Sequence, residues 1–163
     1  MREVHFSETD QPRIDAAAFA KLEQLARNSE RRRARFCLHM DHSDPLQEMV
    51  IALCADAYIP PHRQAGKTKS YVTLKGEIGV VYFSDSGAIE EVIRLTSDGD
   101  SDAAIIRFPT KQWHTVVCHT EFAIYLEIVS GPYIASETEM APWAPSESET
   151  PDANQFLHSI RNA

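Results

Sequence analysis

The sequence lacks a long apolar segment and a surplus of basic residues. No apolar run approaches the roughly 20 residues that a helix needs to cross a bilayer, so no membrane span is expected. The first fifteen residues, MREVHFSETDQPRID, contain no apolar core typical of a secretory signal. Lysine and arginine number 16 against 24 acidic residues, a formal net charge of -8. Because nucleic-acid binding depends on neutralising phosphates, this balance argues against a nucleic-acid partner.

Cysteine is also scarce. Cys37, Cys54 and Cys118 each lie in an apolar stretch, and none belongs to a C-x-x-C pair. An odd number of scattered cysteines indicates reduced, mostly buried thiols, and we therefore expect a cytoplasmic protein. With 163 residues, 43% of them hydrophobic, the chain is long enough for one domain with a proper core.

One helix is expected, near the start of the chain. Asp15 is a plausible N-cap, and AAAFAKLEQLARNS after it places Phe19, Leu22 and Leu25 at helical spacing. After residue 30 the pattern changes to short β-branched and aromatic runs separated by polar turns, and no further helix is expected. The runs cover residues 34–40, 46–59, 70–83, 88–95, 103–109, 113–118 and 122–131. This succession predicts an all-β sandwich or barrel.

The basic cluster RRRAR at residues 31–35 precedes the first of these strands. We interpret it as a solvated approach to the strand, with an anion contact as the alternative. From Arg35 onward, alternation places Arg35, Cys37 and His39 on one face of the strand. The ending SESETPDANQFLHSIRNA is polar and acidic with one small apolar cluster. It is expected either to be disordered or to pack on a neighbouring surface.

Several segments resemble the cupin superfamily, and within it the small WbuC-like cupins. They are RRRARFCLH, YIPPHR, PTKQWHTVV, and EIVSGPY with the later TEMAPWAP. The resemblance covers about residues 13–145 and implies a double-stranded β-helix, or jelly-roll barrel, with one N-terminal α-helix. The expected division is an N-terminal arm and helix over 1–30, a cupin β-barrel over 31–145 and a polar tail over 146–163.

The two cupin motifs are only partly kept. The first is roughly G-x5-H-x-H-x3,4-E-x6-G in the family. Here His62 is kept, Gln64 stands in the place of the second histidine, and Lys69 stands in the place of the carboxylate. The second motif keeps His114 but has Lys111 where the family has glycine. Residues two apart on a strand share a face, so the resemblance directs His62 and Gln64 into the barrel.

An intact cupin set of histidines and a carboxylate suits iron, manganese, nickel or zinc. An ammonium cannot coordinate a metal, and it repels one by about 4 kcal/mol for two unit charges 4 Å apart at an effective dielectric near 20. We therefore expect a divalent metal to be weakly bound or lost. Its candidate ligands are His62, Gln64 and His114, with His39 or Glu127 as an extra ligand.

Two of these residues have alternative interpretations. His39 fits a hydrogen-bonded structural histidine as well as a ligand. Glu127 lies in the apolar run FAIYLEIV, where a buried carboxylate needs a partner. Lys69 could supply that partner, although an outward-facing Glu127 is equally compatible with the sequence.

Three functions stay open at this stage. The first is a pocket for an anionic or sugar-type metabolite, with His62 or His114 as acid or base and Lys69 holding the anion. Tyr71 would line that pocket with Gln64, His39 and Glu127. The resemblance adds a link to polysaccharide biosynthesis. The second is a metal-dependent oxygenase, isomerase or lyase, and the third a non-catalytic cupin that binds a ligand. The resemblance also implies a homodimer.

Overall fold

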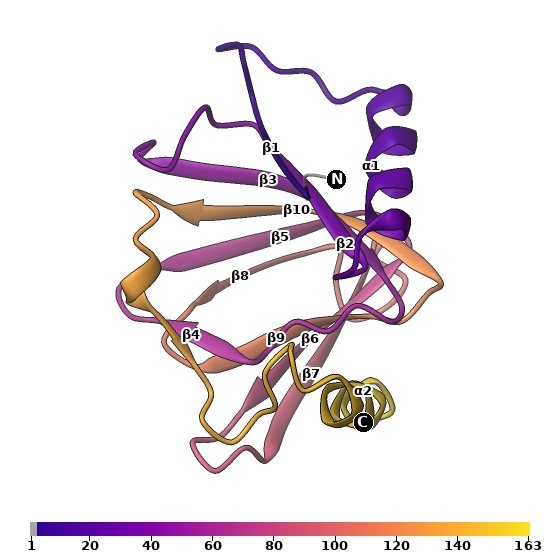
Figure 1. The fold of residues 1–163 in the computed structure, drawn as a ribbon, viewed down its shortest axis with the longest axis vertical. Helices are drawn as coiled ribbons and strands as arrows, with labels where there is room; N and C mark the ends of the chain where they lie inside the picture. The colour runs from indigo at the N-terminus through magenta and orange to yellow at the C-terminus, as the bar shows by residue number, and fades with distance from the viewer. Residues whose placement is uncertain (1–2) are drawn as a thin grey trace.

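Two β-sheets face each other in the structure, and strands distant in sequence lie side by side within each (Figure 1). A computed structural model describes residues 3–163, so the first two residues of the predicted arm lie outside the described range. The larger sheet runs in the order β1 (Val4–Phe6), β2 (Arg33–Cys37), β3 (Leu46–Cys54), β10 (Phe122–Ser130), β5 (Thr68–Lys75) and β8 (Ile105–Pro109). The smaller runs β11 (Thr138–Met140), β4 (His62–Gln64), β9 (Trp113–Cys118), β6 (Glu77–Phe83) and β7 (Ile89–Thr96).

The two sheets are not joined into a closed barrel. In the part of the chain that the structure describes, the six-stranded and five-stranded sheets share no ladder of hydrogen bonds. The fold is therefore an open jelly-roll sandwich, so the predicted jelly roll is found, but its two sheets do not close into a barrel. One consequence is an open edge between the sheets, where side chains from both inner faces reach a common space.

The expected N-terminal helix forms as α1 (Ala16–Asn28). The Asp15 carboxylate accepts a hydrogen bond of 2.9 Å from the amide of Ala18, so Asp15 caps the first turn as predicted. Leu22 and Leu25 turn inward and pack against the outer face of the six-stranded sheet. That contact leaves the opposite, inner face of β2 and β3 free to form the wall between the sheets.

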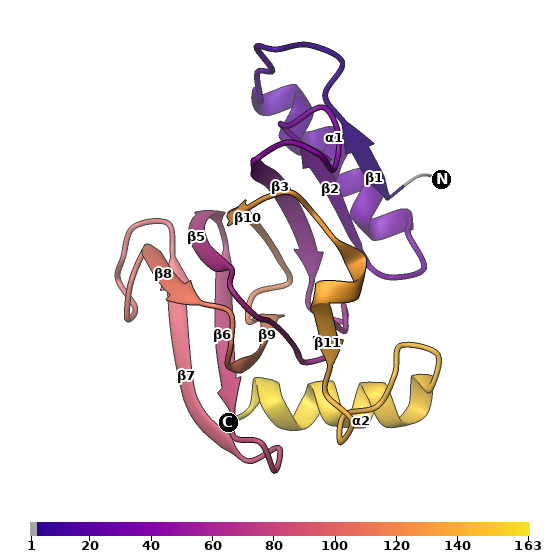
Figure 2. The ribbon, with the colours of Figure 1, turned by 90° about the vertical axis from the view of Figure 1, so that its left-hand side faces the viewer.

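A second helix, α2 (Thr150–Arg161), forms in the predicted polar tail, where no helix was expected. Of the two alternatives, the tail packs on a neighbouring surface, beneath the five-stranded sheet (Figure 2). Ala153, Leu157 and Ile160 are buried there, at a spacing that gives one apolar stripe. A proline in the first turn helps to begin the helix. The first N–H groups of any helix have no acceptor within it, so proline, which has no N–H, loses no hydrogen bond there. Neither helix of residues 3–163 is long and apolar enough to cross a membrane.

Glycine is required at the turn between β5 and β6. Gly76 has a φ of 73°, and a β-carbon there would lie 2.4 Å from the backbone oxygen of Phe122. This turn sends β5 into the six-stranded sheet and β6 into the five-stranded one. Lys69, on β5, and His62, on β4, likewise belong to different sheets and so lie on opposite walls.

Candidate functional site

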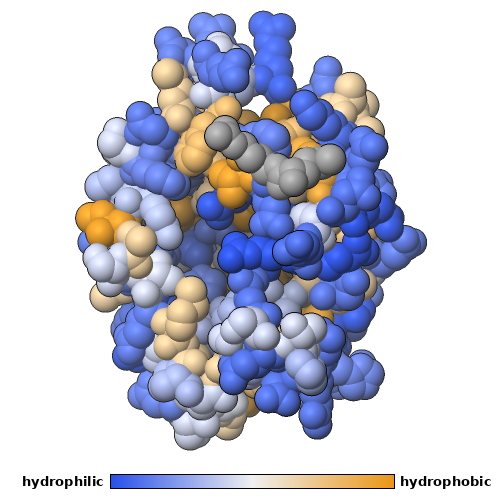
Figure 3. All heavy atoms as spheres, in the orientation of Figure 1, coloured by the Kyte–Doolittle hydropathy of each residue, from blue (hydrophilic) through white to orange (hydrophobic). Residues whose placement is uncertain are grey.

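A cavity of about 400 Å³ lies between the inner faces of the two sheets. Side chains from β2, β3, β10 and β5 form one wall, and β4 with the segment after β10 forms the other. The surface is hollowed between the sheets at this place, with hydrophobic atoms along its upper edge and hydrophilic ones elsewhere around it (Figure 3). Six of the predicted site residues line the cavity: His39, His62, Gln64, Lys69, Tyr71 and Glu127.

His62 and His114 lie opposite each other on the paired strands β4 and β9, with ring centroids 4.7 Å apart. Each Nδ1 faces a backbone carbonyl two residues earlier: Pro60 at 3.1 Å for His62, and Gln112 at 2.9 Å for His114. A carbonyl only accepts hydrogen bonds, so both Nδ1 atoms carry the proton and both Nε2 atoms present a lone pair. His114 is fully buried and lies behind His62, off the cavity wall.

Both histidines are held in the neutral form. Burial, reinforced by the positive charge of Lys69, lowers the pKa of His62 to about 3. Burial, with His62 and Lys69 nearby, holds the pKa of His114 well below its ordinary value of 6.5. Neutral imidazole is a hydrogen-bond acceptor at Nε2, so this pair offers lone pairs and no positive charge.

Stability is expected to fall as the pH falls from 6.5 toward 3. The folded-state pKa values of His62 and His114 lie below the unfolded value of 6.5, so the unfolded chain binds more protons in this window. Each histidine should remove about 1.4 kcal/mol of unfolding free energy per pH unit. Urea unfolding at pH 7.5, 6.5 and 5.5 measures the slope. His62→Gln should make it shallower, and an unchanged slope in that variant would contradict the assignment.

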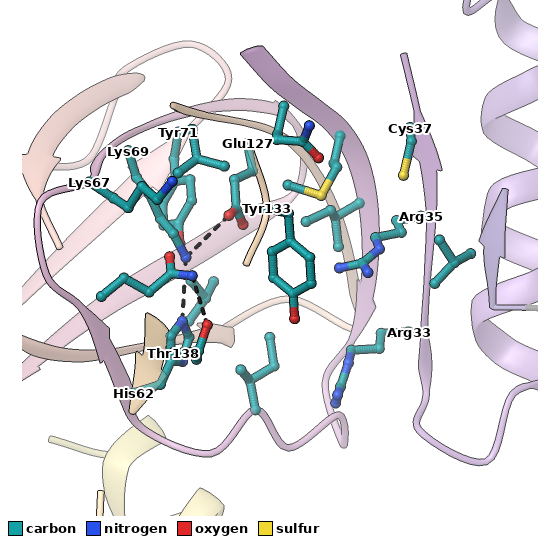
Figure 4. A pocket seen from close by; sticks show the side chains of 18 of the residues that line it. Arg33, Arg35, Cys37, His62, Lys67, Lys69, Tyr71, Glu127, Tyr133 and Thr138 are labelled. Carbon is teal, nitrogen blue, oxygen red and sulfur yellow. Dashed lines mark hydrogen bonds and ion pairs between the residues drawn. The ribbon is translucent and has the colours of Figure 1, made fainter. Parts of the chain in front are cut away.

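Lys69 is the centre of the polar group on the opposite wall. Its Nζ lies 3.2 Å from Oε1 of Glu127 and 3.3 Å from Nε2 of His62, as the dashed lines in Figure 4 show. Glu127 reaches it because β10 pairs with β5, and the two residues lie diagonally on the same face. Lys69 is thus the partner of the buried Glu127, as one of the two sequence-based alternatives predicted. The anion-binding role predicted for Lys69 is weakened, because a carboxylate of the protein already neutralises it.

Gln64 has one end of its amide in use and the other free. Its Nε2 donates to the Thr138 hydroxyl at 2.8 Å, across the β4–β11 pair. Its Oε1 is buried and has no hydrogen-bond partner in residues 3–163. A buried acceptor without a partner is costly, so this oxygen is a candidate contact for a bound ligand.

A metal of the kind found in intact cupin motifs does not fit the residues as they are arranged. The Lys69 ammonium stands at the His62 Nε2 lone pair that such a metal would use. Among the described residues, no group of three or more histidine, cysteine, aspartate or glutamate side chains is placed to hold a metal ion. The charge of Lys69 would also repel a divalent ion at this distance.

Tyr71 and His39 have mainly structural contacts. Tyr71 packs edge-on against Phe108 and Tyr125, and burial raises its pKa well above the ordinary value. It is therefore a neutral phenol. The Nδ1 atom of His39 lies 3.0 Å from both the backbone oxygen and the backbone nitrogen of Glu48, and the ring is buried at the end of the cavity wall. This geometry favours the hydrogen-bonded structural histidine over the ligand.

Two cavity residues were not recognised as site residues in the sequence. Arg33 and Arg35 lie on the inner face of β2 and line the cavity, so they are not the solvated approach that we expected. Alternation with Cys37 was the available signal: the three share one face, and Cys37 is buried. A face that buries a thiol also carries its neighbours two and four residues earlier into the interior.

The cavity wall carries a surplus of positive charge although the whole chain is acidic. Its positively charged residues are Arg31, Arg33, Arg35, Lys67 and Lys69, and its negatively charged residues are Glu3, Glu127 and Glu147. Five cations against three carboxylates leave two more positive than negative groups, whereas the chain has a formal charge of -8. The field inside the cavity therefore favours an anion.

Comparisons with known proteins agree with a cupin-type fold. A family described as a domain of unknown function (DUF6016) matches residues 14–95. Protein SO0799 from Shewanella oneidensis superposes with a TM-score of 0.53 at 13% identity, over 73% of this chain and 74% of that one. CapF from Staphylococcus aureus, described as a capsular polysaccharide assembling protein, gives 0.51 at 12% identity over 66% of this chain. This chain spans only 31% of CapF.

These similarities bear on the fold alone. Both solved structures are cupin-fold proteins, so the coarser prediction of a cupin-type jelly roll is confirmed. No curated protein matches the chain at a significant level. The WbuC-like assignment, the homodimer and the cytoplasmic location stay predictions.

Proposed function

The chain belongs to the family described as a domain of unknown function (DUF6016), and we propose that it binds a small anionic, sugar-type metabolite in its cavity without a metal ion. The observation that carries this proposal is the surplus of cations on the cavity wall of an acidic chain. A volume of about 400 Å³ suits a metabolite of the size of one or two sugar rings.

The hydrogen-bonding groups of the cavity support a hydroxylated ligand. Gln64 presents an acceptor without a partner, and the group formed by Lys69, Glu127 and His62 presents donors and acceptors side by side. Sugar hydroxyls both donate and accept, so they can satisfy such a mixed wall. A purely apolar ligand would leave the Gln64 oxygen buried and unpaired.

Binding is favoured over proton-transfer catalysis by the state of His62. With a pKa of about 3, His62 is neutral near pH 7 and holds no transferable proton at Nε2. General acids and bases work best with a pKa near the working pH. We therefore assign His62 a hydrogen-bonding role in the cavity, in place of the predicted acid or base.

A link to polysaccharide metabolism is part of the proposal. CapF is described as a capsular polysaccharide assembling protein, and its likeness to this chain lies in the fold. The cavity chemistry adds a separate reason, because acidic and activated sugars are the anionic, hydroxylated compounds of such pathways. We propose an acidic sugar as the ligand on these two grounds together.

A ligand screen in the presence of EDTA tests the proposal. Sugar acids, sugar phosphates and nucleotide sugars are added to the protein, and the melting temperature is followed, with neutral sugars as controls. We expect at least one acidic sugar to raise the melting temperature, since a ligand that binds only the folded state stabilises it. Calorimetric titration of that compound then gives its Kd.

Two outcomes contradict the proposal. If no acidic sugar stabilises the protein more than its neutral counterpart, the cations of the cavity do not serve to bind an acidic sugar. If stabilisation requires added iron, manganese, nickel or zinc and is abolished by EDTA, the metal-dependent alternative with His62, Gln64 and His114 replaces it.

A further inference from the structure

Arg35 differs from the other cations of the cavity in having no partner. Its guanidinium points into the pocket from β2, as Figure 4 shows. Within residues 3–163 its side chain makes no ion pair or hydrogen bond, and its Nε is buried without an acceptor. Five N–H groups of a permanently charged side chain are thus available at one end of the cavity.

The carboxylates near β2 form ion pairs with arginines other than Arg35. Glu147 lies 2.5 Å from Arg33 and 3.3 Å from Arg31, and the distance from Glu3 to Arg31 is 3.9 Å. Arg33 also donates to the backbone oxygen of Tyr58 at 2.6 Å. Arg35 is therefore left with an unbalanced charge, although two carboxylates lie on the same wall.

The lysines of the cavity are also neutralised. Lys69 is paired with Glu127 at 3.2 Å, and Lys67 with Glu137 at 3.3 Å. Lys67 further donates to the backbone oxygen of Pro132 at 2.8 Å. The excess of positive charge on the cavity wall is consequently concentrated at Arg35.

An unpartnered, partly buried guanidinium is costly to the folded protein on its own. A planar carboxylate can engage a guanidinium through two parallel hydrogen bonds, and one negative charge balances the one free cation. The buried Nε–H has no acceptor among the described residues, and solvent does not reach it. The cost of the unpartnered guanidinium and the position of its N–H groups both favour binding of an external anion at Arg35.

We propose that Arg35 is the anion-binding residue of the cavity and that the ligand is a hydroxylated carboxylic acid, its carboxylate on Arg35 and its hydroxyls toward Lys69, His62 and Gln64. This assignment rests on the proposed function and names the substrate class of the same site. It moves the anion contact from Lys69 on β5 to Arg35 on β2.

The spacing of the strands sets the length of this ligand. β2 and β5 are separated by β3 and β10, which makes three inter-strand spacings, or roughly 14 Å. Arg35 and Lys69 lie on the two strands at the ends of this span. A carboxylate on Arg35 with hydroxyls near Lys69 therefore requires a chain of several carbons, as in a sugar acid.

Calorimetric titrations with three probes test the inference: gluconate as the carboxylate, glucose 6-phosphate as the phosphate and glucose as the neutral sugar. Arg35→Met should weaken gluconate binding about 10- to 100-fold, because hydrogen bonds to a charged group are lost. Arg35→Lys should recover part of it, since a lysine keeps the charge but not the fork. Arg94→Met is the matched control and should change the Kd less than about 2-fold, because Arg94 does not line the cavity, is 51% exposed and already pairs with Glu77.

The melting temperature of the ligand-free variants separates a binding role from a structural one. Arg35→Met should leave it unchanged or raise it, because the substitution removes an unpaired charge and fills the same space. A fall of several degrees would overturn the inference, since it would show that Arg35 stabilises the fold.

The remaining outcomes distinguish this inference from the proposed function. If wild-type protein binds none of the acidic probes, the proposed function and the inference fall together. If it binds gluconate and Arg35→Met binds it equally well, the inference alone falls. Preferential binding of glucose 6-phosphate that depends on Arg35 overturns the carboxylate assignment.

Discussion

Replacing Lys69 with methionine is expected to lower the free energy of unfolding by about 3–5 kcal/mol. The substitution leaves the Glu127 carboxylate buried without its cation, and breaking a buried ion pair on one side has this cost. Methionine retains the length and apolar stem of lysine, so lost packing contributes little. Urea unfolding at pH 7.5, followed by circular dichroism, measures the change.

A second ion pair of the same length provides the control. Lys75 lies 3.1 Å from Glu23, but its side chain is 60% exposed, against 6% for Lys69. Lys75→Met should therefore cost less than about 1 kcal/mol, as exposed pairs do. The double variant Lys69→Met with Glu127→Gln should recover most of the loss, because neither partner is left charged. A Lys69→Met variant as stable as Lys75→Met would contradict the buried pair.

Lys69→Ala is expected to raise the affinity of the cavity for a divalent metal, although the described histidine and carboxylate side chains are not grouped as a metal site in the wild-type fold. The substitution removes the ammonium that lies 3.3 Å from Nε2 of His62 and frees the Glu127 carboxylate. Imidazole nitrogens and a carboxylate are suitable ligands for zinc and nickel. Both histidines already have Nδ1 on a backbone carbonyl, the arrangement that orients Nε2 toward a metal.

We expect affinity for zinc or nickel to rise at least about 100-fold, since a repulsive charge is replaced by an attractive one. Calorimetric titration and metal content after dialysis measure it. Adding His62→Ala to Lys69→Ala should abolish the gain, and Lys67→Ala, which changes another lysine of the cavity, should not produce it. Near-stoichiometric metal in the wild-type protein would refute the view that Lys69 excludes a metal.

Much of the fold follows from local patterns in the sequence. The Asp15 cap, the apolar stripe of α1 and the alternation of the strands each depend on residues a few positions apart, and they form as predicted. Helix α2 was missed because its segment is mostly polar and has only three residues, Ala153, Leu157 and Ile160, on its buried stripe. Its stability comes from packing beneath β9, which is a tertiary contact that the local pattern does not contain.

The sequence predicted which residues form the candidate site better than it predicted which of them pair with one another. The motif spacing identified His62, Gln64 and Lys69, and all three line the cavity. Which cation is neutralised is decided by cross-strand neighbours, as for Lys69 and Glu127 on β5 and β10, whose residues are far apart in sequence. For the same reason Arg35 looked like one of the four similar arginines of RRRAR until the partners of the cavity cations were known.

The position of β10 has a consequence for the order in which the protein can be assembled during synthesis. This strand lies between β3 and β5 in the six-stranded sheet, and it contributes Glu127 to the cavity. A nascent chain that ends before Phe122 has β3 and β5 without the strand that joins them. Arg35 and Lys69 therefore come to share one wall only when the last strand of that sheet has left the ribosome. Until then the cationic residues of the cavity are exposed to water and to other molecules in the cell, and the cavity is among the last features of the protein to form.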